Sequence, residues 1–127
     1  MSAEWTRTDL NAIDRNDEVG ISSYRSDGTL RPYVTIWAVE ADGHVYVRSA
    51  YGATNPWYRR ALASGRGSIR VAGVAHDIDF VRADATEEPA VDDGYRAKYG
   101  ARYASIVAGI VGDSAHDVTL RLEPSAA

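Results

Sequence analysis

The chain contains no cysteine and a single lysine, and both shortages narrow what it can be. Without cysteine there is no disulfide framework, no thiolate ligand for zinc or an iron-sulfur cluster, and no cysteine nucleophile. Long hydrophobic runs are also missing, because the longest apolar stretch is far shorter than a membrane span. The first ten residues lack the apolar core of a signal peptide. These absences favour a soluble cytoplasmic protein.

Basic residues are fewer than acidic ones, 14 against 18, and almost all of them are arginine. The formal net charge is -4 and the pI is about 5.3, which argues against general nucleic-acid binding because that requires a basic face. All of the 14 basic residues except Lys98 are arginine, a bias typical of a GC-rich, for example actinobacterial, genome. Arginine is nonetheless the side chain whose planar fork grips phosphate and carboxylate. Individual arginines therefore remain candidates for an anion site.

Turn and capping signals divide the 127 residues into short elements of one domain, residues 1–127. Asp42-Gly43 is the strongest short signal for a tight hairpin between two alternating strands. Hairpins with a few inserted helices predict a small α+β barrel and argue against a doubly wound fold. The expected order is a helix at 6–15, strands at 19–24, 30–39 and 45–50, a helix at 56–64, strands at 69–74 and 76–82, a helical region interrupted at Gly100, and a strand at 117–123.

The stretch from Val45 to Gly65 has the residue types of an anion site. A strand ends there in a loop of small residues, and a helix follows with Asn55 as its N-cap and Pro56 at its first position. A helix N-terminus offers free backbone N–H groups and a partial positive charge, and small residues let an anion approach them. The alternative, which local sequence slightly favours, is a plain junction with solvent-facing arginines. Alternation along the strand places Arg48 on the face opposite Val45 and Val47. The side chains that could hold the anion are Arg48, Ser49, Thr54, Arg59 and Arg60.

Aromatic residues gather in the same part of the chain. They are explained either as core packing or as a wall for a flat ring. Tyr51 is the hardest of them to explain as core, because it lies in a loop beside glycine. The group comprises Tyr33, Trp37, Tyr51, Trp57 and Tyr58.

The sequence offers no clear catalyst of its own. Tyr95, Tyr99 and Tyr103 recur at intervals of four, which places them on one face of a helix. An apolar face packed on the barrel explains them better than a pocket lid whose hydroxyls donate protons. The three histidines, His44, His76 and His116, lack the spacing of a metal site. If the protein is an enzyme, a cofactor is expected to carry the reaction.

Residues 24–73, "YRSDGTLRPYVTIW" to "GSIRVAG", resemble the flavin-binding split-barrel superfamily, and within it the deazaflavin-dependent nitroreductase branch. "RSDGTLR", "NPWYRRA", "YRAKYG" and "TLRLEP" look more closely like the domain-of-unknown-function family numbered 2255, which belongs with that superfamily. The resemblance covers residues 5–124. The branch's pattern is matched in order by Gly28, Arg31, Ser49, Gly52, Ala53, Asn55, Pro56, Trp57, Leu62 and Ala63.

The resemblance implies an α+β fold, a small antiparallel split barrel of about six strands, Greek-key type, with short flanking helices. It also implies a cofactor, FMN or a deazaflavin (factor 420), with no cofactor as the remaining alternative. Tyr51 and Thr54 stand where the nitroreductase branch carries basic residues in its loop, and Ala61 stands where it has Asn. By the resemblance, Tyr33, Val34, Thr35 and Ile36 would lie beside the ring. Arg48, Ser49, Gly52, Ala53 and Asn55 would line the phosphate end, with Arg59 or Arg60 assisting, and Tyr51 and Trp57 complete the expected cofactor-binding residues.

The function that follows from the resemblance is that of an oxidoreductase. A hydride would pass from the reduced cofactor to a small unsaturated, nitro or quinone-like acceptor, with Tyr95, Tyr99 or Tyr103 donating the proton. The alternatives are a binding module without redox chemistry and a pathway enzyme that has recruited the pocket for other chemistry, because fold alone does not decide function. A homodimer is expected, since split barrels often build sites between subunits. Neither a metal, nor nucleic acid, nor a membrane is expected as a partner.

Overall fold

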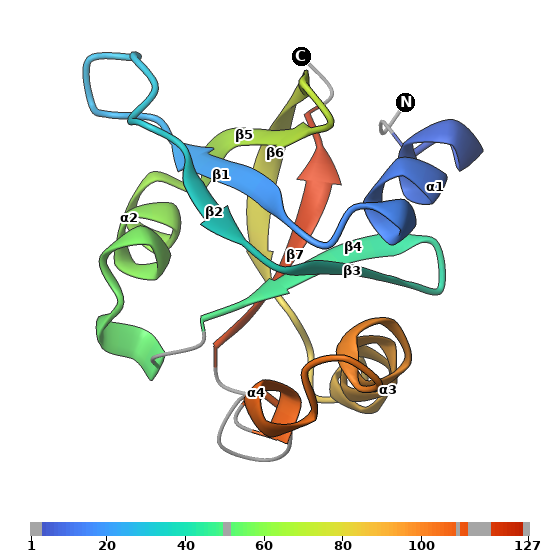
Figure 1. The fold of residues 1–127 in the computed structure, drawn as a ribbon. Helices are drawn as coiled ribbons and strands as arrows, with labels where there is room; N and C mark the ends of the chain where they lie inside the picture. The colour runs from blue at the N-terminus through green and yellow to red at the C-terminus, as the bar shows by residue number, and fades with distance from the viewer. Residues whose placement is uncertain (1–3, 50–51, 109, 112–117, 126–127) are drawn as a thin grey trace.

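The computed structural model describes residues 4–49, 52–108, 110–111 and 118–125. Its strands form one antiparallel sheet in the order β2-β1-β5-β6-β7-β4-β3, and helices lie around the outside (Figure 1). The elements are α1 (Arg7–Arg15), β1 (Val19–Ser23), β2 (Val34–Ile36), β3 (Ala38–Ala41), β4 (His44–Arg48), the 3₁₀ turn η1 (Gly52–Thr54), α2 (Pro56–Ser64), β5 (Arg66–Val71), β6 (Val74–Arg82), α3 (Glu88–Tyr99), α4 (Ala104–Ala108) and β7 (Thr119–Pro124).

The sheet closes into a barrel through the bend between β2 and β3. These two strands stand at opposite ends of the strand order, yet only Trp37 separates them in the chain. Together they correspond to the strand predicted at 30–39, and counting them as one gives the expected six-stranded barrel. The predicted bounds were wrong, because Leu30 forms only an isolated bridge with Tyr24, while continuous pairing begins at Val34, just beyond Pro32, and extends to Ala41. Proline has no N–H for a sheet ladder, which explains the late start.

Helix α3 holds the bend at Trp37 from outside the barrel. The ring of Tyr99 stacks on that of Trp37 with centroids 4.0 Å apart. The Tyr99 hydroxyl donates to the carbonyl oxygen of Asp17 at 2.7 Å, and the Ala38 N–H donates to the same hydroxyl at 3.3 Å. Lys98 Nζ donates to the carbonyl oxygens of Ile13 and Ala38 at 2.6 and 2.7 Å. The bend is therefore tied to both α1 and α3.

The local signals for turns and helix ends are confirmed. Asp42 and Gly43 both have positive φ, 53° and 81°, as a two-residue hairpin of this type requires. Thr6 caps α1 in a reciprocal capping box with Asp9. Gly65 ends α2 in the left-handed conformation with φ 73°.

Two apolar clusters occupy the two faces of the β3–β4 hairpin. Val45 and Val47 point into the barrel interior, whereas Tyr46 and its cross-strand partner Val39 point outward and pack beneath α3 and α4. Figure 1 shows these two helices together at one end of the barrel, away from α2. The outer face of this hairpin is therefore buried as well. No helix in the described ranges is long and apolar enough to span a membrane.

Candidate functional site

Helix α2 has one buried face and one that lines an open groove. The buried face packs on the barrel through Trp57, Tyr58 and Ala61. The opposite stripe recurs at helical spacing along the whole length of α2, so the groove follows the flank of the helix. This stripe consists of Pro56, Arg59, Arg60, Ala63 and Ser64.

This groove, which we call the arginine groove, has a volume of about 1,090 Å³. Its walls are α2 on one side and the loop before β2 on the other, with Arg66 at the start of β5 closing one end. None of its described lining residues is acidic, which makes it a strongly basic hollow in a protein of net charge -4. The lining residues are Tyr24, Arg25, Ser26, Gly28, Arg31, Pro56, Arg59, Arg60, Ala63, Ser64 and Arg66.

The loop wall of the groove is held by its own hydrogen bonds. The Arg25 N–H donates to the Thr29 carbonyl oxygen at 2.7 Å, and the Gly28 N–H donates to the Arg25 carbonyl oxygen at 3.0 Å. Gly28 has φ 88°, a conformation that suits glycine. Asp27 accepts hydrogen bonds from the Thr29 hydroxyl and N–H, which lower the pKa of its carboxyl group. The one carboxylate of the loop is thus engaged within the loop.

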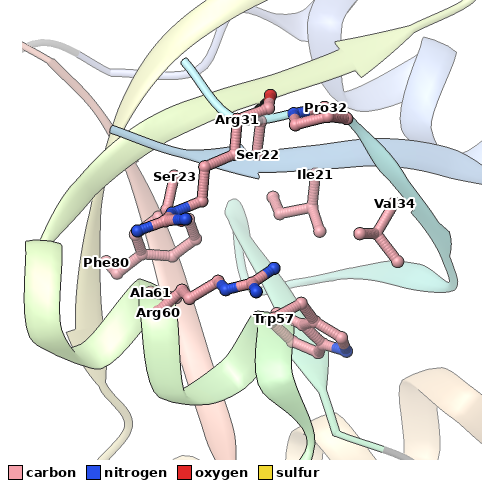
Figure 2. A pocket seen from close by; sticks show the side chains of 10 residues that line it. All are labelled: Ile21, Ser22, Ser23, Arg31, Pro32, Val34, Trp57, Arg60, Ala61 and Phe80. Atoms are coloured by element: carbon pink, nitrogen blue, oxygen red, sulfur yellow. Dashed lines mark hydrogen bonds between the residues drawn. The ribbon is translucent and has the colours of Figure 1, made fainter. Parts of the chain in front are cut away.

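An apolar pocket adjoins the groove and shares two arginines with it. Figure 2 shows Arg31 entering this pocket from the segment before β2 and Arg60 entering it from α2. The pocket is narrow, with a cavity volume of about 20 Å³, which is room for about one water molecule. Its other lining residues are Ile21, Ser22, Ser23, Pro32, Val34, Trp57, Ala61 and Phe80.

Arg31, like Arg60, lines both cavities, and the hydrogen bonding of its side chain is incomplete. Its backbone is fixed, because its N–H donates to the Ser23 carbonyl oxygen at 3.1 Å and its carbonyl oxygen accepts from the Ser22 hydroxyl. Its Nε atom is buried without a hydrogen-bond partner among the described residues. A buried donor without a partner is costly and invites an acceptor. An anion placed between the pocket and the groove would supply that acceptor.

The prediction that Arg48 binds phosphate is wrong in this structure. Its guanidinium has no exposed surface and forms ion pairs with Glu88 at 2.9 Å and Asp92 at 2.5 Å. It also donates to the Thr119 hydroxyl and to the Ile110 carbonyl oxygen, both at 2.9 Å. The direction of the side chain was predicted correctly, opposite to Val45 and Val47, but α3 covers that face. Arg48 is therefore an internal anchor for α3.

The loop of small residues that was predicted to hold the phosphate lines neither cavity. Ser49 is buried, and its hydroxyl donates to the Gly52 carbonyl oxygen instead of facing a ligand. Ala53 and Asn55 also stand outside both linings. Tyr51 lies outside the described residues. Of the cofactor-binding residues predicted between Arg48 and Arg60, and among those that the structure describes, three line the two cavities: Trp57, Arg59 and Arg60.

The predicted ring-binding residues divide between two faces of β2. Val34, paired with Ile21, lines the apolar pocket. Tyr33 instead packs over Gly20 on the outside, donates to the Ser68 hydroxyl at 2.8 Å and lies under Arg70. Successive side chains of a strand point to opposite faces, so four consecutive ones cannot face a single ring. Only the Val34 side of the strand can serve the site.

The three predicted proton donors belong to the apolar cluster that packs between α3, α4 and the outer face of the β3–β4 hairpin. Tyr95 and Tyr99 are fully buried, and Tyr103 packs on Trp37 and Tyr99. Burial is the main cause that raises the pKa of both Tyr95 and Tyr99. None of the three lines the groove or the pocket. The apolar-face interpretation accounts for their packing.

Replacing Tyr95 and Tyr99 separately by phenylalanine tests these placements. Tyr99→Phe removes the hydroxyl that bonds Asp17 and Ala38 and should lower the free energy of unfolding by about 1–2 kcal/mol. Tyr95→Phe removes a buried hydroxyl that has no partner among the described residues, so stability should stay the same or rise. Urea denaturation of both variants measures the difference. Equal losses in the two variants would contradict the bonding assigned to Tyr99.

Sequence reasoning missed most of the arginine groove. Arg25 and Arg66 were not selected, and Arg31 entered only through the resemblance. Each of them adjoins a glycine turn, a weak signal that also occurs in ordinary surface loops. They meet because β1 pairs with β5, which places the Tyr24 N–H 3.1 Å from the Arg66 carbonyl oxygen.

One family model matches residues 9–122, and its description is "Uncharacterized protein conserved in bacteria (DUF2255)". This is the family that the sequence motifs indicated. No curated protein matches the chain.

Solved structures share the fold at low sequence identity. HutZ, the heme storage protein from Vibrio cholerae, is 14% identical with a TM-score of 0.64, covering 92% of this chain and 87% of its own. An F420 reductase is 14% identical with a TM-score of 0.53, covering 91% and 92%. A FAD-binding protein from Mesorhizobium loti is 16% identical with a TM-score of 0.54, covering 98% and 94%. These likenesses confirm the predicted α+β split barrel.

Proposed function

Because this chain belongs to the DUF2255 family of uncharacterized bacterial proteins, we propose a function from its own site: it binds a phosphorylated flavin or deazaflavin and acts as an oxidoreductase. The observation that carries the proposal is the pair Arg31 and Arg60, which join a basic groove to an apolar pocket. A ligand that is flat and apolar at one end and anionic at the other suits such a junction. Proteins of this fold include ones described as a heme storage protein, an F420 reductase and a FAD-binding protein.

The residues present fit the phosphate end of such a cofactor. Arg31 and Arg60 line both cavities, Arg59 lines the groove, and none of the three forms an ion pair among the described residues. Charge-assisted hydrogen bonds from arginine to phosphate are about twice as strong as neutral ones. The unpartnered Nε of Arg31 would gain the acceptor that it lacks.

A single chain does not enclose the ring end. The apolar pocket, at about 20 Å³, is too small for a ring system, so the ring would lie at its mouth, against the exposed side of Val34, which is 40% accessible. We propose that a second copy of the chain covers this mouth in a homodimer. Native mass spectrometry of the cofactor-loaded protein reads both the subunit number and the bound mass, and a one-to-one monomer complex would exclude the dimer.

When bound, a reduced flavin or deazaflavin supplies a hydride, and the proposed acceptors are small unsaturated, nitro or quinone-like molecules. The chain itself would bind the phosphate, orient the ring and exclude water. The described lining of the two cavities contains no histidine, lysine or carboxylate, and the hydroxyl of its tyrosine, Tyr24, already donates to Asp77 at 2.9 Å. This observation favours the second candidate, a ligand-binding module without redox chemistry. Reduction of a nitro compound by loaded protein would exclude that candidate.

Arginine variants test the phosphate site through binding. Replacing Arg31 or Arg60 by alanine should weaken FMN binding about tenfold or more, because a charge-assisted bond of about 1.5–3 kcal/mol is lost. Riboflavin, which has no phosphate, should bind the variants and the parent alike. The absorption spectrum of each protein during titration with FMN, factor 420 and riboflavin measures this.

Arg70→Ala is the matched control, because Arg70 is exposed on the outside of β5 and lies over Tyr33, away from both cavities. A protein that takes up neither FMN nor factor 420 would refute the proposed cofactor. Equal losses for FMN in Arg70→Ala and Arg60→Ala would refute the placement of the phosphate.

A further inference from the structure

The bend at Trp37 bears on the mouth of the proposed site through the short strand β2. This strand has three residues, pairs with β1 alone and ends at the bend. Its Val34 lines the apolar pocket, at whose mouth the ring would lie. Strands of globular proteins most often have about five or six residues, so a strand of three depends on what holds its ends. The contacts at the bend therefore help to set the position of Val34.

Lys98 of α3 joins this bend to α1 through two hydrogen bonds, which we call the Lys98 junction. Its Nζ atom donates to the carbonyl oxygen of Ala38, the first residue after Trp37, at 2.7 Å, and to that of Ile13 at 2.6 Å. Ile13 lies in the last turn of α1, where the free carbonyl groups of a helix favour a positive charge. Hydrogen bonds from a charged donor are about twice as strong as neutral ones. The charge of Lys98 therefore strengthens both bonds.

The surroundings of Lys98 allow that charge to change near neutral pH. Burial is the main cause that lowers its pKa to about 8, while Asp14 and Asp17, at the end of α1 and just beyond it, act to raise it. Asp17 is also paired with Arg102 at 2.6 Å, and Glu40 of β3 lies on the strand face that α3 does not cover. The bend itself carries no titratable side chain. Among the described residues Lys98 forms no ion pair that would fix its charge.

We propose that the ionised Lys98 is a positioning residue for the ring end of the proposed site: it holds the bend, and through the bend it holds β2 and Val34 in the arrangement that binds the ring. The proposal rests on the proposed function in one respect, the placement of the ring at the mouth beside Val34. When Lys98 loses its proton, both bonds lose the contribution of the charge. The bend then loosens, and the ring is held less firmly.

The first test is a titration of flavin binding between pH 7 and pH 9, with riboflavin and FMN as the probes. With a pKa of about 8, roughly nine tenths of Lys98 is protonated at pH 7 and roughly one tenth at pH 9. If the ionised form is the one that binds, the dissociation constant should rise with pH by up to about tenfold. Both probes should show the same rise, because the effect lies at the ring end and the arginines keep their charge.

Three substitutions separate the charge of Lys98 from its packing. Lys98→Met should bind flavin as weakly at pH 7 as the parent does at pH 9, and Lys98→Arg keeps a charge that does not titrate, so both should lose the pH dependence. Tyr99→Phe also weakens the bend but leaves Lys98 in place, and it should keep the slope of the parent. The α-amino group titrates in the same range and is present in every variant. A slope that survives in Lys98→Met or in Lys98→Arg would overturn the proposal.

A second measurement reads the bend without any ligand. Hydrogen exchange of the amides of residues 34–38 at pH 7, followed by mass spectrometry, should be about threefold faster or more in Lys98→Met than in the parent. Arg96→Met is the matched control, because Arg96 is an exposed cation of the same helix and pairs with Asp93 at 3.5 Å. This control should exchange as the parent does. Equal exchange in Lys98→Met and the parent would show that Lys98 does not hold the bend.

The outcomes separate this proposal from the proposed function. If no flavin or deazaflavin binds but Lys98→Met speeds exchange at residues 34–38, the cofactor is refuted and the hold of Lys98 on the bend stands. If flavins bind to the parent with the same affinity at pH 7 and pH 9, the cofactor stands and the role of Lys98 is refuted.

Discussion

Replacing Arg48 by methionine should lower the free energy of unfolding by about 3–5 kcal/mol, one of the two largest effects expected from a single change. The guanidinium has no exposed surface, and the side chains of Glu88 and Asp92 that face it are 3% and 11% exposed. Without Arg48, both carboxylates remain buried and lose the guanidinium that neutralises them. Methionine fills a similar volume, so the loss measures the charge and the hydrogen bonds more than a cavity. Guanidinium chloride denaturation followed by circular dichroism gives the value.

Arg96→Ala is the matched control, because Arg96 pairs with another aspartate of α3. Its contact with Asp93 is 3.5 Å long and exposed, so its loss should cost less than about 0.5 kcal/mol. Adding Glu88→Gln and Asp92→Asn to Arg48→Met should restore part of the stability by removing the buried charges. A cost for Arg48→Met no greater than that for Arg96→Ala would show that Arg48 does not neutralise these carboxylates.

The Arg48 cluster shows where sequence reasoning reached its limit. Alternation in β4 predicted correctly that Arg48 faces away from Val45 and Val47. The same reasoning treated that face as open, although α3 covers it with Glu88 and Asp92 from 40 and 44 residues further along the chain. Glu88 lies in the first turn of α3, and Asp92 follows one turn later on the same face. Local sequence shows the direction of a side chain, and tertiary packing decides what it meets.

The ends of helices could be predicted where one residue type supplies a capping hydrogen bond or a backbone conformation that the helix end requires. The capping oxygen of Thr6 and the positive φ of Gly65 are such cases. Helix α1 begins after Thr6, one residue later than predicted, and α2 ends before Gly65, as predicted. The arginine groove was not predictable in this way. It combines residues from the loop after β1, from α2 and from the start of β5. Only the pairing of β1 with β5 brings these segments together.

That pairing requires a glycine at position 67, which makes Gly67→Ala the second large prediction. A Cβ atom there would lie 2.0 Å from the carbonyl oxygen of Ser22 and 2.7 Å from Cε2 of Phe80. Contacts below 3.0 Å force a shift, and here the closest atom belongs to the backbone of β1. Ser22 and Phe80 both line the apolar pocket, so the strain would fall on the wall of the proposed site.

We expect Gly67→Ala to lower the free energy of unfolding by about 3 kcal/mol or more, since β1 must move away from β5 or part of their ladder must open. Gly94→Ala is the control, because its Cβ would make an ordinary 3.4 Å contact with Val39 and alanine favours a helix over glycine by about 1 kcal/mol. Chemical denaturation should therefore move the two variants in opposite directions. A Gly67→Ala variant as stable as the parent would mean that β1 and β5 do not approach this closely, and the shared wall of pocket and groove would then have to be placed differently.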